Sequence, residues 1–275
     1  MPMRARRQVV EGVTELNTEL MRRTRSSRSA TPARSETDAQ PRVTAVIPAL
    51  NEAENLPHVL PRIGGLVDEV VLVDGQSTDA TQDVAFALRP DVRLITQQGR
   101  GKGDALRAGF EEATGDIIVM LDADGSTDPA EIPSFVGALL AGADFVKGSR
   151  FIQGAGTDDM PMFRRIGNRA LSLLVRILYR CRCSDITYGF NACWARVLPQ
   201  LRLDGDGFEI EGMMNLRALT AGLRVVEVAS HEAPRRHGEG RLRTIPDGWL
   251  YLKIIIRERF RQRPRIEASW ATEAR

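Results

Sequence analysis

Cysteine is scarce in this chain, and a strong net charge is missing. The three cysteines, Cys181, Cys183 and Cys193, are an odd number without the spacing of a disulfide framework, so we expect reduced thiols and a cytoplasmic location. A Cys-x-Cys pair without nearby histidines or further cysteines is poor evidence for zinc. The formal net charge of +2 gives no strong overall field, and we expect no nucleic-acid partner.

Long hydrophobic runs are missing as well. No run approaches the roughly 18 apolar residues that a membrane span requires, and the N-terminus lacks the apolar segment of a secretory signal. The 275 residues are 43% hydrophobic and 27% charged, which is typical of a soluble globular protein with a sizeable core. Residues 1–41 are rich in Arg, Ser, Thr and Pro, and we expect a disordered tail with at most a short helix from Val9 to Met21.

From Val43 onward, strands and helices are predicted to alternate. The expected strands are residues 43–47, 69–73, 92–96, 117–121 and 144–147, and the expected helices are residues 52–62, 78–88, 102–113 and 129–140. This alternation is typical of βαβ units. The sequence therefore predicts an α/β protein with an open, mostly parallel sheet and helices on both faces.

After Arg150 the pattern changes to longer amphipathic helices. We expect helices at residues 163–183, 207–222 and 247–263, and one strand at residues 223–229. The predicted organisation is a domain of residues 42–245, with halves at about 42–150 and 151–245. A basic amphipathic helix and tail are expected at residues 246–275.

The last helix combines apolar residues between Trp249 and Phe260 with a dense set of cations. Six cations stand against the single Glu258, namely Lys253, Arg257, Arg259, Arg261, Arg263 and Arg265. The apolar part is too short to span a bilayer but suits a helix lying in the interface of an anionic membrane. An ordinary helix that packs its isoleucines on the protein and leaves its arginines in solvent is the other interpretation.

The buried strand predicted at residues 117–121 ends in Asp122, Ala123 and Asp124. Two carboxylates this close repel each other, so a positive group is expected between them. A simple turn would need only one aspartate. A divalent metal site and a catalytic aspartate nucleophile both remain open at this point.

Further polar residues follow the other strands of the predicted sheet. Glu52 follows the first strand and Asp74 ends the second, and ligands of open α/β sheets bind at these carboxyl ends. An acidic edge suits the hydroxyl and N–H groups of a nucleoside, with a metal for its phosphates. The glycine-rich stretch at residues 98–109 matches neither a dinucleotide fingerprint nor a P-loop. Its Arg100 and Lys102 are candidates for contact with a diphosphate.

Several of these segments carry a family resemblance. VTAVIPALNEAENL, EVVLVDGQSTDATQDVA, GRGKGDALRAGFEEATGDIIVMLDADGSTDP and ADFVKGSRF, in this order, resemble the family 2 glycosyltransferases with the GT-A fold, a Rossmann-like α/β fold. FRRIGNRALSLLVRILY, DITYGFNACW, GFEIEGMM and RRHGEGRLRTIPDGW extend the likeness to the branch of dolichyl-phosphate and polyprenyl-phosphate mannose and glucose synthases. The resemblance covers about residues 43 to 252.

The resemblance implies an inverting transfer of a sugar from a UDP- or GDP-sugar to a lipid phosphate, with Mg²⁺ or Mn²⁺ as cofactor. It places the metal on Asp122 and Asp124, with Glu209 completing the shell, and makes Asp124 and Arg150 catalytic. The implied donor-binding residues are Pro48, Leu50, Glu52, Asp74, Lys102, Asp122 and Ala123. The implied acceptor-phosphate residues are Arg150, Arg164, Asn168, His237 and Arg241, the last two in a mobile loop. The two halves of the domain would hold donor and acceptor respectively.

The acceptor stays open between two chemistries. A phosphate acceptor is already anionic and needs no strong base, whereas a hydroxyl acceptor needs one, for which Asp185 and Glu211 are the candidates. Larger members of the branch carry extra transmembrane helices that this sequence does not show. We therefore expect a protein that associates peripherally with the inner face of the cell membrane. The oligomeric state, the sugar and the nucleoside are undetermined.

Other protein classes fit less well. LDADGST also resembles the haloacid dehalogenase phosphatase motif, but that motif ends the first strand of its domain and here it follows the fourth. Sugar-nucleotide pyrophosphorylases have a glycine-rich phosphate loop after the first strand, where this chain has PALNE. A non-catalytic nucleotide-sugar binding protein would not need Arg150 and Arg164.

Overall fold

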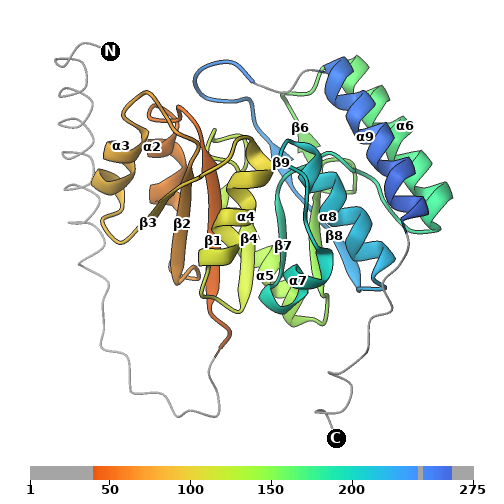
Figure 1. The fold of residues 1–275 in the computed structure, drawn as a ribbon, viewed down its shortest axis with the longest axis horizontal. Coiled ribbons are helices and arrows are strands. Elements are labelled where there is room, and N and C mark those ends of the chain that lie inside the picture. Colours follow the sequence, from red (N-terminus) through yellow and green to blue (C-terminus); the bar gives the residue numbers. More distant parts are fainter. Residues whose placement is uncertain (1–39, 241–243, 262–275) are drawn as a thin grey trace, which may run out of the picture.

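The computed structural model describes residues 40–240 and 244–261 (Figure 1). Apart from residues 40 and 41, the expected N-terminal tail with its helix from Val9 to Met21 lies outside the described residues. Arg241, Arg263 and Arg265 also lie outside them.

Seven strands form the central sheet, in the order β3-β2-β1-β4-β7-β5-β8. They are β1 (Val43–Ala49), β2 (Glu69–Asp74), β3 (Arg93–Thr96), β4 (Ile117–Met120), β5 (Phe145–Ser149), β7 (Asn191–Trp194) and β8 (Val225–Ala229). Every pairing is parallel except those of β7, which runs antiparallel between β4 and β5. The predicted mostly parallel sheet is confirmed. The four-residue β7 was not predicted. A separate pair joins β6 (Gly156–Thr157) and β9 (His231–Glu232).

The helices follow the predicted order with shifted ends. They are α2 (Leu56–Val59), α3 (Thr81–Leu88), α4 (Lys102–Glu112), α5 (Ile132–Leu140), α6 (Met162–Tyr179), α7 (Leu198–Leu201), α8 (Glu209–Thr220) and α9 (Thr244–Phe260), with short 3₁₀ turns η2 (Leu60–Arg62), η3 (Pro129–Glu131) and η4 (Ala195–Val197). The helix predicted at residues 52–62 is split because Pro57 and Pro61 lack an N–H and each starts a new turn. Helix α6 ends earlier than predicted because Arg180 adopts a left-handed conformation, with φ of 52°.

Helices cover both faces of the sheet, as predicted. Successive strand residues point to opposite faces, so Ile47 and Val46 on β1 belong to different cores. The first core packs against α2, α3 and α5, and the second against α4, α7 and α8 (Figure 1). The carboxyl ends of β1, β2 and β4 consequently meet at one edge, between the two layers of helices.

A third core joins the second half of the chain to α9. Val175 of α6, Leu216 of α8 and Ile255 of α9 are buried together in it. Helix α9 therefore packs Ile254 and Ile255 into the protein and leaves Ile256 exposed. None of the described helices combines the length and the hydrophobicity needed to cross a bilayer.

Candidate active site

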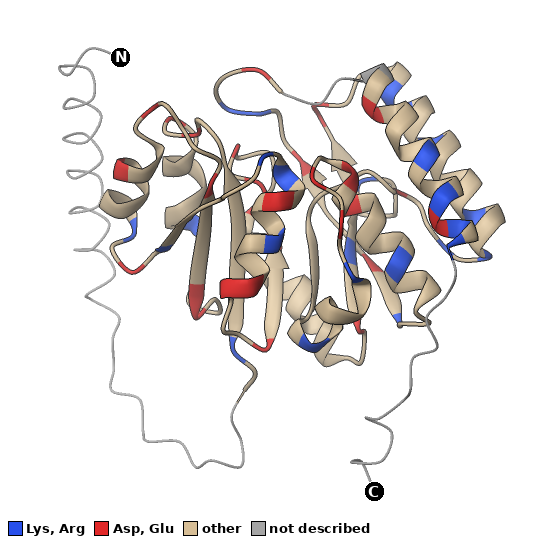
Figure 2. Ribbon diagram, in the orientation of Figure 1, with Lys and Arg blue, Asp and Glu red and all other residues tan. Residues whose placement is uncertain are grey.

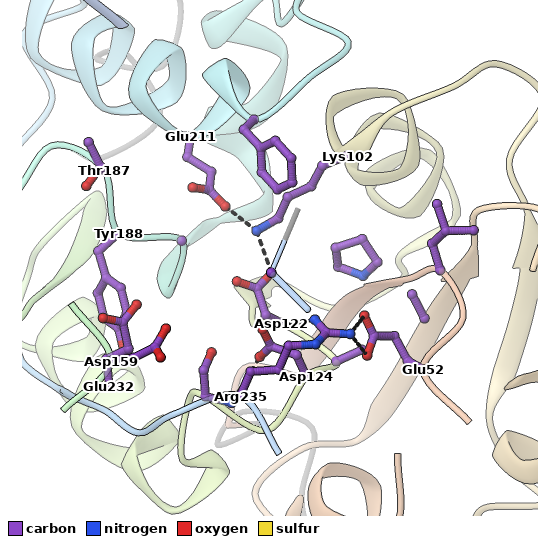
Figure 3. A pocket seen from close by; sticks show the side chains of 18 of the residues that line it. Glu52, Lys102, Asp122, Asp124, Asp159, Thr187, Tyr188, Glu211, Glu232 and Arg235 are labelled. Atoms are coloured by element: carbon purple, nitrogen blue, oxygen red, sulfur yellow. Dashed lines mark hydrogen bonds and ion pairs between the residues drawn. The ribbon is translucent and has the colours of Figure 1, made fainter. Parts of the chain in front are cut away.

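A pocket of about 620 Å³ opens at the carboxyl edge of the sheet. Its walls come from the ends of β1 and β4, the start of α4 and α8, the start of α6, and the segment after β9 (Figure 3). The structure brings ten of the predicted site residues to this pocket. They are Pro48, Leu50, Glu52, Lys102, Asp122, Ala123, Asp124, Arg150, Arg164 and Glu211.

Five further predicted residues are described but do not line the pocket. Asp74, at the buried end of β2, accepts hydrogen bonds from Ser77 N and from Gln82 Nε2, the latter at 2.7 Å. It therefore shapes the turn that follows β2. The carboxylate of Glu209 accepts a hydrogen bond from Gly207 N at the start of α8. Asp185, Asn168 and His237 complete this set.

The acidic pair lies on a tight turn after β4. Gly125 has a φ of +76°, and Asp124 Oδ1 accepts a hydrogen bond from Ser126 N at 2.9 Å. This arrangement presents the second oxygen of Asp124 and the carboxylate of Asp122 to the pocket (Figure 3). The turn thus places two oxygen ligands of the kind that Mg²⁺ and Mn²⁺ prefer side by side.

The expected positive charge beside the pair is supplied by the protein itself. The Lys102 ammonium contacts both Asp122 and Glu211, and Arg235 Nη1 lies 3.4 Å from Asp124 Oδ2. Burial alone would lower the pKa of Lys102, but the two carboxylates outweigh burial and raise this pKa. Burial also raises the pKa of Glu211, against the opposing effect of Lys102.

Arg235 is a site residue that sequence reasoning missed. Its Nη2 lies 2.7 and 2.6 Å from the two carboxylate oxygens of Glu52, across the floor of the pocket (Figure 3). Burial raises the pKa of Glu52, and hydrogen bonds from Arg235 and Asn55 oppose that rise. The available signal was the pair of arginines before His237, but nothing in the sequence indicates which of the two turns inward.

At the other end of the pocket, Arg150 is held by several partners. Its guanidinium donates to Asp185 at 2.7 and 2.9 Å, to Glu232 at 2.9 Å and to Thr187 at 2.9 Å. Asn168 Nδ2 donates to the same Asp185 carboxylate at 2.9 Å. Burial alone would raise the pKa of Asp185, but the charge and hydrogen bonds of Arg150 lower it to about 2.

Arg164 differs from Arg150 in this respect. It lies in the first turn of α6 and lines the pocket, yet within the described residues its side chain has no hydrogen-bond or ion-pair partner. His237 faces away from this end, since its ring stacks on His58 with 5.6 Å between centroids. Within the described residues, this end of the pocket therefore combines an arginine side chain without an ionic partner and a buried network of Arg150, Asp185 and Asn168.

Asp122 and Asp124 offer the donor set of one divalent ion. Among residues 40–240 and 244–261, no three acidic, histidine or cysteine side chains gather in a metal-binding arrangement, so Glu209 does not join Asp122 and Asp124. Mg²⁺ at phosphate sites is commonly bound by one or two carboxylates, substrate phosphates and water. The two carboxylates at the pocket wall match that donor set.

Comparisons with known proteins identify the family of this chain. The model of the family described as "Glycosyl transferase family 2" matches residues 44–198. The chain is 36% identical over 215 residues to the undecaprenyl-phosphate mannosyltransferase of Micrococcus luteus, covering 73% of this chain and 87% of that protein. It is 33% identical to the dolichol-phosphate mannosyltransferase of Pyrococcus furiosus, covering 78% of this chain and 63% of that protein.

Among solved structures, the chain is similar to glucosyl-3-phosphoglycerate synthase of Mycobacterium tuberculosis. In its complex with Mn²⁺, uridine diphosphate and glucosyl-3-phosphoglycerate, the TM-score is 0.62 at 24% identity, covering 83% of this chain and 86% of that chain. This likeness concerns the fold and confirms the predicted GT-A type of α/β architecture.

Proposed function

The chain belongs to glycosyl transferase family 2, and we propose that it moves a sugar from a UDP- or GDP-sugar to a polyprenyl phosphate with inversion at the anomeric carbon. The observation that carries the proposal is the pocket itself, with the Asp122–Asp124 turn at one end and, at the other, Arg164, whose side chain has no ionic partner among the described residues. Relatives named as mannosyltransferases of undecaprenyl and dolichol phosphate support this acceptor class and make mannose the first sugar to test.

The donor half would be residues 42–150. Pro48, Leu50 and Ala123 offer the walls for the nucleoside, and Asp74 holds the adjacent turn. Asp122 and Asp124 would hold Mg²⁺ or Mn²⁺, and such an ion neutralises charge on a diphosphate leaving group. Lys102, fixed by Asp122 and Glu211, adds a positive charge at the same place.

The acceptor half would be residues 151–245. Among the described residues, Arg164 is the pocket cation without an ionic partner and would meet the phosphate, with Arg150 and Asn168 shaping the wall behind it. An acceptor phosphate is an anionic nucleophile, so its attack on the anomeric carbon needs no proton removal. His237 and Arg241 belong to the same proposal as acceptor-phosphate residues, and Arg241 lies outside the described residues.

A hydroxyl acceptor is the second candidate, and Glu211 favours it. This carboxylate lines the pocket and has a raised pKa, which suits a general base. Asp185, the other candidate base, is held by Arg150 and Asn168 and has a lowered pKa, so it is the poorer base. The solved relative with a glucosyl-3-phosphoglycerate product uses a soluble acceptor of this kind.

Peripheral contact with the inner face of the cell membrane forms the last part of the proposal. Helix α6 contains no acidic residue, and α9 carries a run of cations towards its end (Figure 2). The large apolar residues exposed on these two helices are Met162, Phe163, Ile166, Leu173, Ile177, Trp249, Ile256 and Phe260. A surface that combines apolar and cationic side chains suits an anionic bilayer. The pocket opens beside the first turn of α6, where such a surface would deliver a lipid phosphate.

A donor screen tests the proposed function. Purified protein is incubated with radiolabelled UDP- or GDP-sugars, Mg²⁺ or Mn²⁺, and either a polyprenyl phosphate or phosphoglyceric acid. Label in the organic phase with one nucleotide sugar is the expected result. Label only in the phosphoglycerate product would favour the hydroxyl acceptor, and label in neither would contradict both.

A further inference from the structure

We propose that Arg235 competes with the divalent ion for the carboxylates of the donor site and thereby makes the protein select the metal–nucleotide complex over the free metal. This inference rests on the proposed function, since it takes Asp124 as a metal ligand. It adds a selecting residue and a coupled backbone segment that the family assignment does not contain.

Only one carboxylate oxygen of Asp124 is available to a metal ion. Oδ1 accepts the backbone hydrogen bond from Ser126 N, so Oδ2 is the oxygen left for a metal. Arg235 Nη1 faces that same Oδ2 at 3.4 Å. A guanidinium and a divalent cation cannot both occupy this position, because two cations within a few ångströms repel strongly in a partly dry site.

The guanidinium of Arg235 is held in place mainly by Glu52. The side chains of Arg235, Glu52 and Asp124 are only 16%, 9% and 22% exposed. Nη2 of Arg235 contacts both oxygens of Glu52, which makes this the main anchor of the guanidinium. A free metal ion must therefore displace a charge-assisted contact before it reaches Asp124, and its affinity falls accordingly.

A nucleotide diphosphate would give the guanidinium of Arg235 new hydrogen-bond acceptors. When the metal arrives with a nucleotide diphosphate, the displaced guanidinium has anionic oxygens beside it to which it can donate. Arg235 then changes from a competitor into a partner of the ligand. The same residue consequently weakens binding of the free ion and supports binding of the complex.

The backbone around Arg235, residues 233–237, is also bonded to the donor site. Ala233 N donates to Ser126 O at 2.9 Å, and His237 N donates to Asn55 Oδ1 at 2.9 Å. Arg235 Nε also donates to His237 O, and Asn55 Nδ2 donates to Glu52. Segment 233–237 is thus tied to the donor site through the same residues that hold the guanidinium.

Free Mn²⁺ binding provides the first test. The affinity for Mn²⁺ without nucleotide is measured by titration with electron paramagnetic resonance for the full chain, Arg235→Gln, Arg235→Ala and Arg236→Ala. Arg236 is the matched control, because it is the exposed neighbour whose side chain has no ion-pair or hydrogen-bond partner within the described residues. We expect both Arg235 variants to bind free Mn²⁺ at least about fivefold more tightly than wild type, with Arg236→Ala within twofold of it. Equal affinities for the Arg235 and Arg236 variants would overturn the competition.

A metal-free measurement separates this inference from the proposed function. Amide hydrogen exchange at Ala233 and His237 should accelerate severalfold in Arg235→Gln and stay unchanged in Arg236→Ala. If these amides do not respond, the tie between Arg235 and its segment is wrong. If they respond and no protein binds Mn²⁺ even with UDP or GDP, the proposed metal site fails instead. If wild type binds Mn²⁺ with nucleotide and the Arg235 variants gain nothing for the free ion, the competition alone is wrong.

Discussion

Arg150 and Asp185 form a buried bidentate ion pair, with Nε 2.7 Å from Oδ2 and Nη2 2.9 Å from Oδ1. Asp185 is 0% exposed, and Glu232 and Thr187 accept further hydrogen bonds from Nη1 and Nη2 of the guanidinium. The resemblance assigned Arg150 to the acceptor phosphate. Four of its five side-chain N–H groups are engaged within the described residues, so we propose that its main contribution is to hold the pocket wall in shape.

Replacement of Arg150 should therefore destabilise the fold. In Arg150→Ala the buried Asp185 carboxylate loses its counter-ion, which typically costs about 3–5 kcal/mol. Arg150→Lys should lose a large part of the same stability, because an ammonium cannot make the two-pronged contact. The free energy of unfolding in urea measures both. Arg169→Ala, which removes an exposed cation of α6, is the control and should change stability by less than about 0.5 kcal/mol. A loss below about 1 kcal/mol in Arg150→Ala would contradict this interpretation.

The lowered pKa of Asp185 predicts a pH dependence. The pKa is about 2 in the folded protein and about 3.9 when unfolded, so the stabilisation of about 2–3 kcal/mol is complete above pH 5. It is lost as pH falls through these values, and about half should be gone at pH 3. The stability difference between wild type and Asp185→Asn should shrink accordingly between pH 5 and pH 3 in urea unfolding. A difference that stays constant over this range would show that Asp185 is not held ionised by Arg150.

Arg164 is expected to recognise the acceptor phosphate. Arg164→Ala should raise the KM for a short, water-soluble polyprenyl phosphate at least about tenfold, because a charge-assisted hydrogen bond is lost. The KM for the nucleotide sugar should stay within twofold. Arg169→Ala, one α6 residue that does not line the pocket, should leave both constants unchanged. A rise in the donor KM with no change for the acceptor would place Arg164 in the wrong half of the site.

The exposed face of α6 should govern membrane binding. Ile166→Ser, Leu173→Ser and Ile177→Ser combined should weaken co-sedimentation with anionic vesicles at low salt at least tenfold, since three large apolar side chains no longer enter the interface. Wild type should no longer pellet with anionic vesicles at high salt, and it should not pellet with neutral vesicles at low salt. Phe86→Ser with Leu140→Ser, exposed on α3 and α5, is the control. Equal pelleting of the triple variant and wild type would contradict the assignment. Truncation after Asp247 would not test membrane binding by α9 alone, because it also removes Tyr251, Ile254 and Ile255 from the third core.

The sequence predicts those parts of the site that depend on local pattern. An apolar strand followed by Asp122 and Asp124 indicates a buried strand with a polar end, and parallel topology brings such ends together. The antiparallel β7 was missed because four residues carry too little periodicity to be recognised. Its insertion between β4 and β5 is settled by tertiary packing.

The ionic partners of the site residues could not be predicted in the same way. Arg235 meets Asp124 from 111 residues away and Glu52 from 183 residues away. Lys102 reaches Glu211 across the pocket, and Glu211 rather than Glu209 turns inward from α8. Which of two nearby charged residues faces a pocket depends on the rotation of a helix or loop, which the acidic and basic pattern alone does not determine.

The role of Asp124 is the central claim, and one rate measures it most directly. In Asp124→Asn the amide oxygen can still accept the hydrogen bond from Ser126 N, so the turn should keep its shape while the charge is lost. The initial rate of label transfer from the preferred nucleotide sugar to polyprenyl phosphate, with saturating Mn²⁺ and a circular dichroism spectrum equal to wild type, should fall at least about 100-fold. A rate within twofold of wild type would contradict the account.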